Sequence, residues 1–99
     1  MNQLTNLSQV QTMSSREIAK LTNKEHKNVK VDIEKMLHEL EIDALSFQLI
    51  YKDSMNRDQI EYHLPKRETL ILTSGYSIVL RAKVVDRWQE LENKQTKLF

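Results

Sequence analysis

Two amphipathic segments separated by a three-residue turn constrain the fold of this chain more than any other feature. Ser14 and Glu17 have the spacing of a capping box, in which the serine hydroxyl accepts from the Glu17 amide and the carboxylate reaches back to the cap. The sequence therefore predicts a helix that begins at Ser14 and directs Ile18 and Leu21 inward, followed by a turn over residues 22–24.

The second segment, from about Glu25 to Leu40, repeats apolar residues at the 3.6-residue period of a helix. Its predicted inward stripe consists of Val29, Ile33, Met36, Leu37 and Leu40. The opposite face carries Lys27, Val31, Glu34 and His38, and its flanks carry Asn28 and Lys30. Two such helices joined by a short turn predict a helix-turn-helix over Ser14–Leu37.

The segment that follows alternates apolar and polar residues, first over residues 47–52 and again over residues 59–64. Because the link over residues 53–58 is rich in Asp, Ser and Asn, we expect an antiparallel hairpin. A short helix should then start at Pro65 and stop at Gly75 as a left-handed cap. With a longer helix from about Ile78 to Lys94, the predicted class is α+β: a winged-helix-like helix-turn-helix with a β-hairpin and two C-terminal helices.

With 99 residues, of which 39% are hydrophobic and 29% charged, the chain is expected to form one domain over residues 12–95. Residues 1–11 should be a flexible lead-in that ends in a short extended piece near Thr12 and Met13, and residues 96–99 a tail. No apolar run approaches the ~20 residues of a membrane span, so no membrane contact is expected. The absence of cysteine fits a reducing cytoplasm.

No arrangement typical of an enzyme is visible. The chain has no glycine-rich phosphate loop, and its three histidines form no catalytic constellation with other residues. Glu34 and His38 lie one helical turn apart and could share a metal, but a solvated ion pair accounts for them more simply. We therefore expect no catalytic residue, no metal site and no cofactor.

The chemistry of the helix-turn-helix favours double-stranded DNA as the partner. Since the net charge is only +1, attraction to DNA must come from local clustering, and six basic residues between Arg16 and Lys35 supply it. Lys27 and Asn28 are the best candidates for base readout, because lysine reaches guanine acceptors and asparagine can bridge the edge of adenine. The predicted DNA-binding residues are Arg16, Lys24, His26, Lys27, Asn28, Lys30 and Arg57.

Some of these residues could stabilise the fold rather than contact DNA. His26 projects toward the buried side of its helix and could instead hydrogen-bond the backbone of the turn, and Asn28 could serve as a cap. Arg57 on the hairpin could contact the adjacent groove of DNA, although Asp53 and Asp58 weaken the attraction to phosphate.

The last predicted helix suggests self-association. Its apolar residues fall on two sides, one with Ile78, Ala82, Val85 and Trp88 and the other with Leu80, Val84 and Leu91. Two apolar faces are more than a small domain needs, so we expect one of them to pack against the same helix of a second copy. The predicted homodimer interface consists of Leu80, Val84, Arg87 and Leu91.

Three motifs together resemble the Rha-type phage regulatory proteins and the N-terminal domains of phage antirepressor-like proteins. They are SSREIAKLTNKEHKNVKVDIEKML from Ser14, LPKRETLILTSGY from Leu64 and RAKVVDRWQELE from Arg81. The resemblance covers roughly residues 12–93. It implies a phage or prophage origin, a place in the cytoplasm of a bacterial host cell, a winged-helix-like DNA-binding domain and a regulatory role. Relatives often continue into a C-terminal effector domain.

Two functions remain open at this point. The first is a small dimeric DNA-binding transcriptional regulator. The second is an antirepressor or host-defence inhibitor that binds a host or phage protein rather than DNA. A net charge near neutral, Val31 on the expected reading face and an acidic patch over residues 39–43 favour the second.

Overall fold

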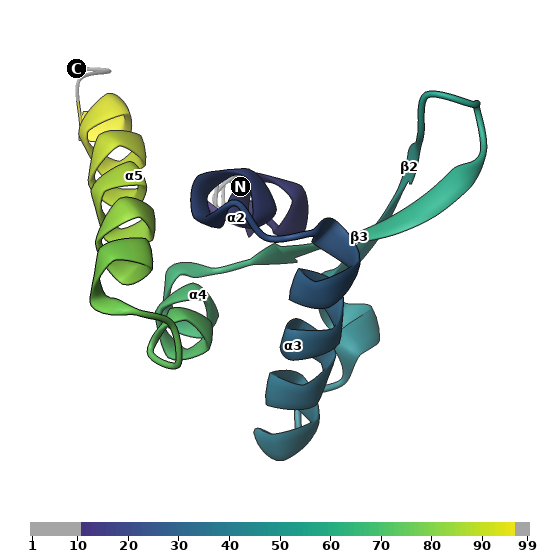
Figure 1. Cartoon of the computed structure of the whole chain (residues 1–99), viewed down its shortest axis with the longest axis horizontal. Coiled ribbons are helices and arrows are strands. Elements are labelled where there is room, and N and C mark those ends of the chain that lie inside the picture. The colour runs from purple at the N-terminus through teal and green to yellow at the C-terminus, as the bar shows by residue number, and fades with distance from the viewer. Residues whose placement is uncertain (1–10, 97–99) are drawn as a thin grey trace, which may run out of the picture.

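A computed structural model describes residues 11–96, with side chains through Lys94. The structure is α+β, as predicted, with four helices and a three-stranded antiparallel sheet in the described part of the chain (Figure 1). Its elements are β1 (Met13–Ser14), α2 (Ser15–Thr22), α3 (His26–Glu39), a 3-10 turn η1 (Ala44–Phe47), β2 (Gln48–Lys52), β3 (Asp58–Leu64), α4 (Lys66–Thr73) and α5 (Ile78–Thr96). This order is compatible with a winged-helix-like fold. Most of the predicted lead-in and tail lies outside the described residues.

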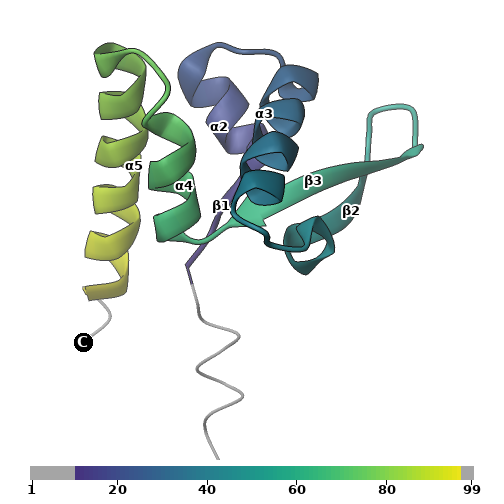
Figure 2. The same cartoon turned by 90° about the horizontal axis from the view of Figure 1, so that it is seen from below.

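The sheet has the strand order β1-β3-β2. The predicted hairpin is confirmed, with β2 and β3 paired from Gln48 opposite Tyr62 to Lys52 opposite Asp58. The predicted extended piece near Met13 is also confirmed as β1, which pairs with the end of β3 through Met13 opposite Leu64. Figures 1 and 2 show the hairpin projecting away from the helices, on the side of the molecule opposite α5.

The turn between α2 and α3 follows the sequence pattern with one difference. The Ser14 Oγ accepts from the Glu17 amide at 3.0 Å and caps α2, as expected. The Glu17 carboxylate does not reach back to the cap, because its Oε2 accepts from Arg87 Nε at 2.6 Å. Asn23 ends α2 with a left-handed φ of 56°, and the chain then enters α3 at His26.

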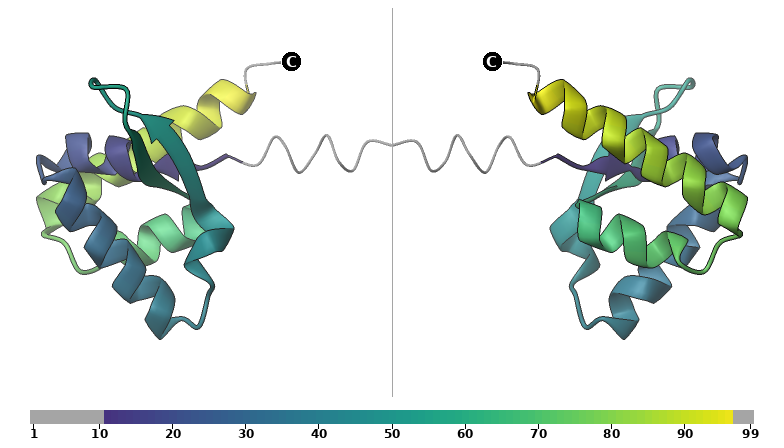
Figure 3. Two further views of the ribbon diagram at one scale, coloured as in Figure 1. Left: turned by 90° about the vertical axis from the view of Figure 1, so that its right-hand side faces the viewer. Right: turned by 90° about the vertical axis from the view of Figure 1, so that its left-hand side faces the viewer.

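The core lies where α2, α3, β3 and α5 meet. Seen from its two sides, the molecule presents α3 and the hairpin on one and α5 on the other (Figure 3). The side chains of Ile18, Ile33, Leu64 and Val84 are fully buried between these elements, and Trp88 is 2% exposed. This packing positions α2 and α3 against the sheet and against the C-terminal helices. Among the described helices, none is long and apolar enough to cross a membrane.

The buried face of α5 removes Val84 from the predicted dimer interface. Val84 is fully buried in the core of its own chain, and Leu91 is partly buried against that core. Val84 and Trp88 are four residues apart and so share one face of the helix, whereas the prediction from periodicity assigned them to different sides. Val84 is therefore unavailable to a second copy. Arg87 contacts Glu17 of α2 within the chain, and Leu80 is half-buried.

The predicted left-handed cap at Gly75 is also wrong. The helix α4 ends at Thr73, and Ser74 follows in a right-handed conformation with a φ of −62°. The Ser74 hydroxyl donates to the Ile71 carbonyl at 2.6 Å, and the Tyr76 amide donates to the Thr73 carbonyl at 2.9 Å. These bonds satisfy carbonyls at the helix end without a positive φ at Gly75.

Candidate nucleic-acid interface

The first two turns of α3 present polar side chains to solvent. Val29 and Ile33 anchor this helix in the core, so Lys27, Asn28 and Val31 on the other side are exposed. Lys27 Nζ lies 3.6 Å from Glu25 Oε1, but both side chains are largely in solvent. Neither the side chain of Asn28 nor that of Lys30 makes a hydrogen bond or ion pair with any other residue the structure describes. This surface can therefore donate hydrogen bonds to a ligand.

His26, the first residue of α3, is tied to two other elements. Its Nε2 lies 2.8 Å from the Oγ of Ser15 on α2, and this fully buried hydroxyl also accepts from the Tyr62 amide of β3 at 3.0 Å. The partner of His26 is thus a side-chain hydroxyl rather than the backbone of the turn. Because Ser15 accepts from Tyr62, its own proton can go to a neutral His26 ring.

The surroundings of His26 favour that neutral ring. Burial is the largest cause that lowers the pKa of His26 from its ordinary value of 6.5, and the positive charges of Lys30 and Arg16 act in the same direction. Glu61 opposes them. The ring also lies beside that of Tyr51, with 6.2 Å between the centroids. The main structural role of His26 is therefore to connect α3 to α2 and to the hairpin.

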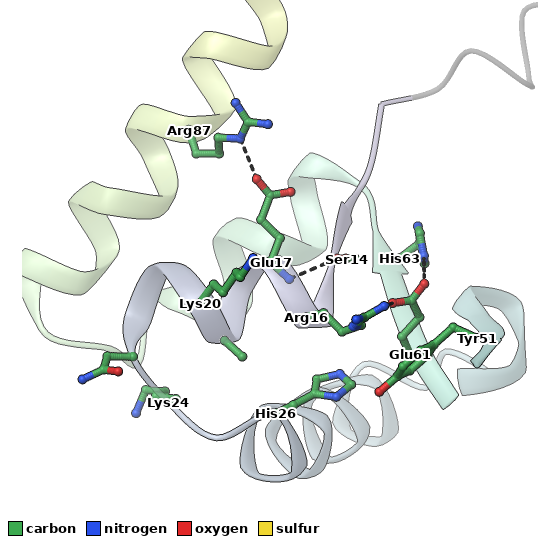
Figure 4. Close-up of a pocket in the computed structure, with 12 residues that line it drawn as sticks. Ser14, Arg16, Glu17, Lys20, Lys24, His26, Tyr51, Glu61, His63 and Arg87 are labelled. Carbon is green, nitrogen blue, oxygen red and sulfur yellow. Dashed lines mark hydrogen bonds and ion pairs between the residues drawn. The ribbon is translucent and has the colours of Figure 1, made fainter. Parts of the chain in front are cut away.

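An open groove of about 960 Å³ runs along α2, between the hairpin and α5 (Figure 4). The Arg16 guanidinium lies 4.1 Å from the centre of the Tyr51 ring, with Nη1 3.8 Å from Glu61 Oε1. His63 Nε2 lies 2.8 Å from the other oxygen of Glu61. Lys24, at the far end of the groove, places Nζ 4.7 Å from the Tyr76 ring centre. Four basic residues and two glutamates line the groove, namely Arg16, Lys20, Lys24, Arg87, Glu17 and Glu61.

The structure thus divides the predicted DNA-binding residues between two surfaces. Arg16, Lys24 and His26 line the groove along α2. Lys27 and Asn28 lie on the exposed side of α3, and the half-buried Lys30 lies beside them on the same helix. On the first surface the cations lie near carboxylates and aromatic rings. On the second, few groups of the protein compete with a ligand for the hydrogen-bond donors.

Arg57 at the hairpin tip belongs to neither surface. Its Nε lies 3.1 Å from Asp53 Oδ2, and its amide donates to Asp53 Oδ1 at 2.9 Å. These bonds shape the turn, where Asn56 adopts a φ of 60°. The hydrogen bond from the Arg57 amide is the largest cause that lowers the pKa of Asp53. Lys52 Nζ is 2.6 Å from Asp58 Oδ1, so the basic side chains of the hairpin tip are paired within the hairpin.

A second link joins α3 to the sheet, and no sequence pattern indicated it. The Tyr62 hydroxyl donates to Glu34 Oε2 at 2.6 Å and accepts from Gln48 Nε2 at 3.2 Å. Burial and the bond to Glu34 raise the pKa of Tyr62. The helical spacing favoured a pair between Glu34 and His38 instead. The described residues contain no group of three or more His, Cys, Asp or Glu side chains that could hold a metal ion.

Comparison with known protein families identifies a match over most of the chain. The family model described as phage regulatory protein Rha matches residues 13–93, which is most of the chain. The match includes α2, α3, the hairpin, α4 and most of α5. No curated protein and no solved structure matches the chain. The chain therefore belongs to the Rha family of phage regulatory proteins.

Proposed function

We propose that this phage regulatory protein is a DNA-binding transcriptional regulator that places the first two turns of α3 in the major groove. The observation that carries the proposal is the exposure of Lys27 and Asn28 beside Lys30 on a helix held by its opposite face. Such donors at the start of a helix suit both phosphates and base edges. The proposal involves no catalytic step, metal or cofactor, and places the protein in the cytoplasm of a bacterial host.

We propose different roles for the predicted DNA-binding residues. Lys27 and Asn28 would contact base edges, because neither has a strong partner in the protein. Lys30 and Lys24 would contact phosphates on either side of the α2–α3 turn. Arg16 would also contact phosphate, although it must share its charge with Glu61. Arg57 has the smallest expected contribution, since Asp53 holds it.

A titration against duplexes from the control region of the phage or prophage that encodes the protein tests this function. The variants are Lys27→Ala with Asn28→Ala, and Lys35→Ala as an exposed lysine two turns further along the same helix. Loss of one good base contact weakens binding by about 1–3 kcal/mol, so the double variant should lose at least about tenfold in affinity. Equal affinities of wild type and double variant would remove α3 from the mechanism.

A protein-binding antirepressor or host-defence inhibitor is the second candidate, and Val31 favours it. Its side chain is 60% exposed in the middle of the proposed reading face, next to Glu34 on the same helix. An apolar side chain beside a carboxylate suits a protein surface better than a phosphate backbone. A host or phage protein captured in stoichiometric amount from nuclease-treated lysate, and released by Val31→Lys, would support this candidate.

A further inference from the structure

The strand β2 leaves one edge of the sheet open. It is the outer strand in the order β1-β3-β2, so no strand of the described part of the chain pairs with its other edge. Proteins usually protect such an edge with proline, a bulge or charges. Over Gln48–Lys52 the only charge is Lys52, and its ammonium lies 2.6 Å from Asp58 Oδ1 in the same hairpin. The edge is therefore available for a further strand.

Exposed apolar side chains gather at this edge. Leu49 is 52% exposed and Ile50 70%, although both lie in a regular strand. Ile60, directly opposite Ile50 on β3, is 38% exposed, and Leu45 in the preceding η1 is 69% exposed. Because successive side chains of a strand point to opposite faces, Ile50 and Leu49 supply apolar surface on both faces. A second strand would cover this surface on each side.

We propose that β2 pairs with β2 of a second copy, antiparallel and with a two-fold axis at Ile50, so that the two sheets become continuous. In this register Ile50 lies opposite Ile50 of the partner subunit, and Leu49 lies opposite Tyr51 of the partner subunit. Gln48 then lies opposite Lys52 of the partner subunit, whose ammonium can donate to its amide oxygen. Apolar residues thus oppose apolar ones, and no like charges meet.

The charge and hydropathy pattern selects this register. Moving the axis to Tyr51 would set Ile50 opposite Lys52 of the partner subunit and Leu49 opposite Asp53 of the partner subunit. Moving it to Leu49 would set Ile50 opposite Gln48 of the partner subunit. With the axis at Ile50, the strand pairs favourably with its own sequence, as a two-fold interface requires. A strand that binds an unrelated peptide would not need to match its own sequence. The inference rests on the sheet alone and does not depend on DNA binding.

Cysteine cross-linking gives the sharpest test, because the wild-type chain contains no cysteine. Ile50→Cys places two thiols together at the proposed axis, so mild oxidation should yield a disulfide-linked dimer. Ile60→Cys is the matched control on the same face of the same hairpin. Its two thiols would be three strand spacings apart, about 14 Å, whereas a disulfide needs Cα atoms within about 7 Å. Absence of the Ile50→Cys dimer, or equal cross-linking of both variants, would overturn the proposal.

Light scattering on the full chain provides the second measurement. Wild type should have twice the mass of one chain, and Ile50→Lys should have the mass of one chain with an unchanged circular dichroism spectrum. Val79→Lys introduces the same charge at an exposed apolar position of α5, where the side chain is 65% exposed, and should stay dimeric. A monomeric wild type, or a monomeric Val79→Lys, contradicts pairing through β2. If Ile50→Lys does not fold, the cross-linking pair decides.

Discussion

The hydroxyl of Ser15 and the ring of His26 are 2.8 Å apart, and this bond joins the first two described helices of the domain. The same hydroxyl accepts from the Tyr62 amide at 3.0 Å, so one buried oxygen fixes α2, α3 and β3 relative to one another. The orientation of α3, and hence of its exposed donors, depends on this junction.

Replacing Ser15 with Ala should therefore destabilise the domain. The substitution leaves the buried Tyr62 amide without an acceptor, and an unsatisfied buried group lowers the free energy of unfolding by about 1–3 kcal/mol. Urea unfolding followed by circular dichroism measures the change. Ser54→Ala, at an exposed position of the hairpin turn, is the control and should stay within about 0.5 kcal/mol of wild type. Similar midpoints for the two variants would show that the junction contributes little.

The domain should become less stable as the pH is lowered, and part of this loss should depend on His26. Because the folded state lowers the pKa of His26 below 6.5, the unfolded chain binds the proton more readily. The free energy of unfolding should therefore hold above pH 6.5 and decline as the pH falls through 6.5 toward the lower folded pKa. His26→Asn, which cannot be protonated, should flatten this part of the profile. If the stability of wild type and of His26→Asn depended on pH in the same way between pH 7 and the lower folded pKa, His26 would not be the group responsible.

The local parts of the fold were predictable from the sequence because neighbouring residues determine them. The Ser14 cap depends on a group three residues away, and the hairpin turn depends on Asp53, whose carboxylate accepts from two amides within the turn. Helical periodicity likewise identified Val29 and Ile33 as inward. Each of these features is encoded within about one turn of chain.

Features that depend on distant residues were not predictable. The apolar residues of α5 spread around the helix, so periodicity alone did not show which side is buried, and Val84 was assigned to a dimer interface instead of the core. Ser15 and His26 are 11 residues apart, and Glu34 and Tyr62 are 28 apart, so no local pattern marks these pairs. The open edge of β2 depends on the strand order, which alternation alone does not specify. The DNA-contact residues stay a prediction.

The ion pair between Arg87 and Glu17 should connect α5 to the start of α2. Arg87 Nε lies 2.6 Å from Glu17 Oε2, with both side chains about one-third exposed. A partly exposed pair contributes about 0.2–1 kcal/mol, and salt should weaken it. A double-mutant cycle with Arg87→Gln and Glu17→Gln isolates this coupling. Arg81→Gln, on an exposed part of the same helix, is the control. A coupling energy of zero at low salt would contradict the prediction.

Val84 and Val79 allow the strongest comparison, because they are the same residue type on one helix with opposite environments. Val84 is fully buried and Val79 is 65% exposed. Val84→Ala removes two buried methyl groups and leaves a space beside Trp88, so the free energy of unfolding should fall by about 2 kcal/mol. Val79→Ala should change it by less than about 0.5 kcal/mol. Thermal and urea unfolding measure both. If Val84→Ala were as stable as wild type, or if it changed the oligomeric mass while leaving unfolding unaltered, the side of α5 that carries Val84 would be a surface rather than core.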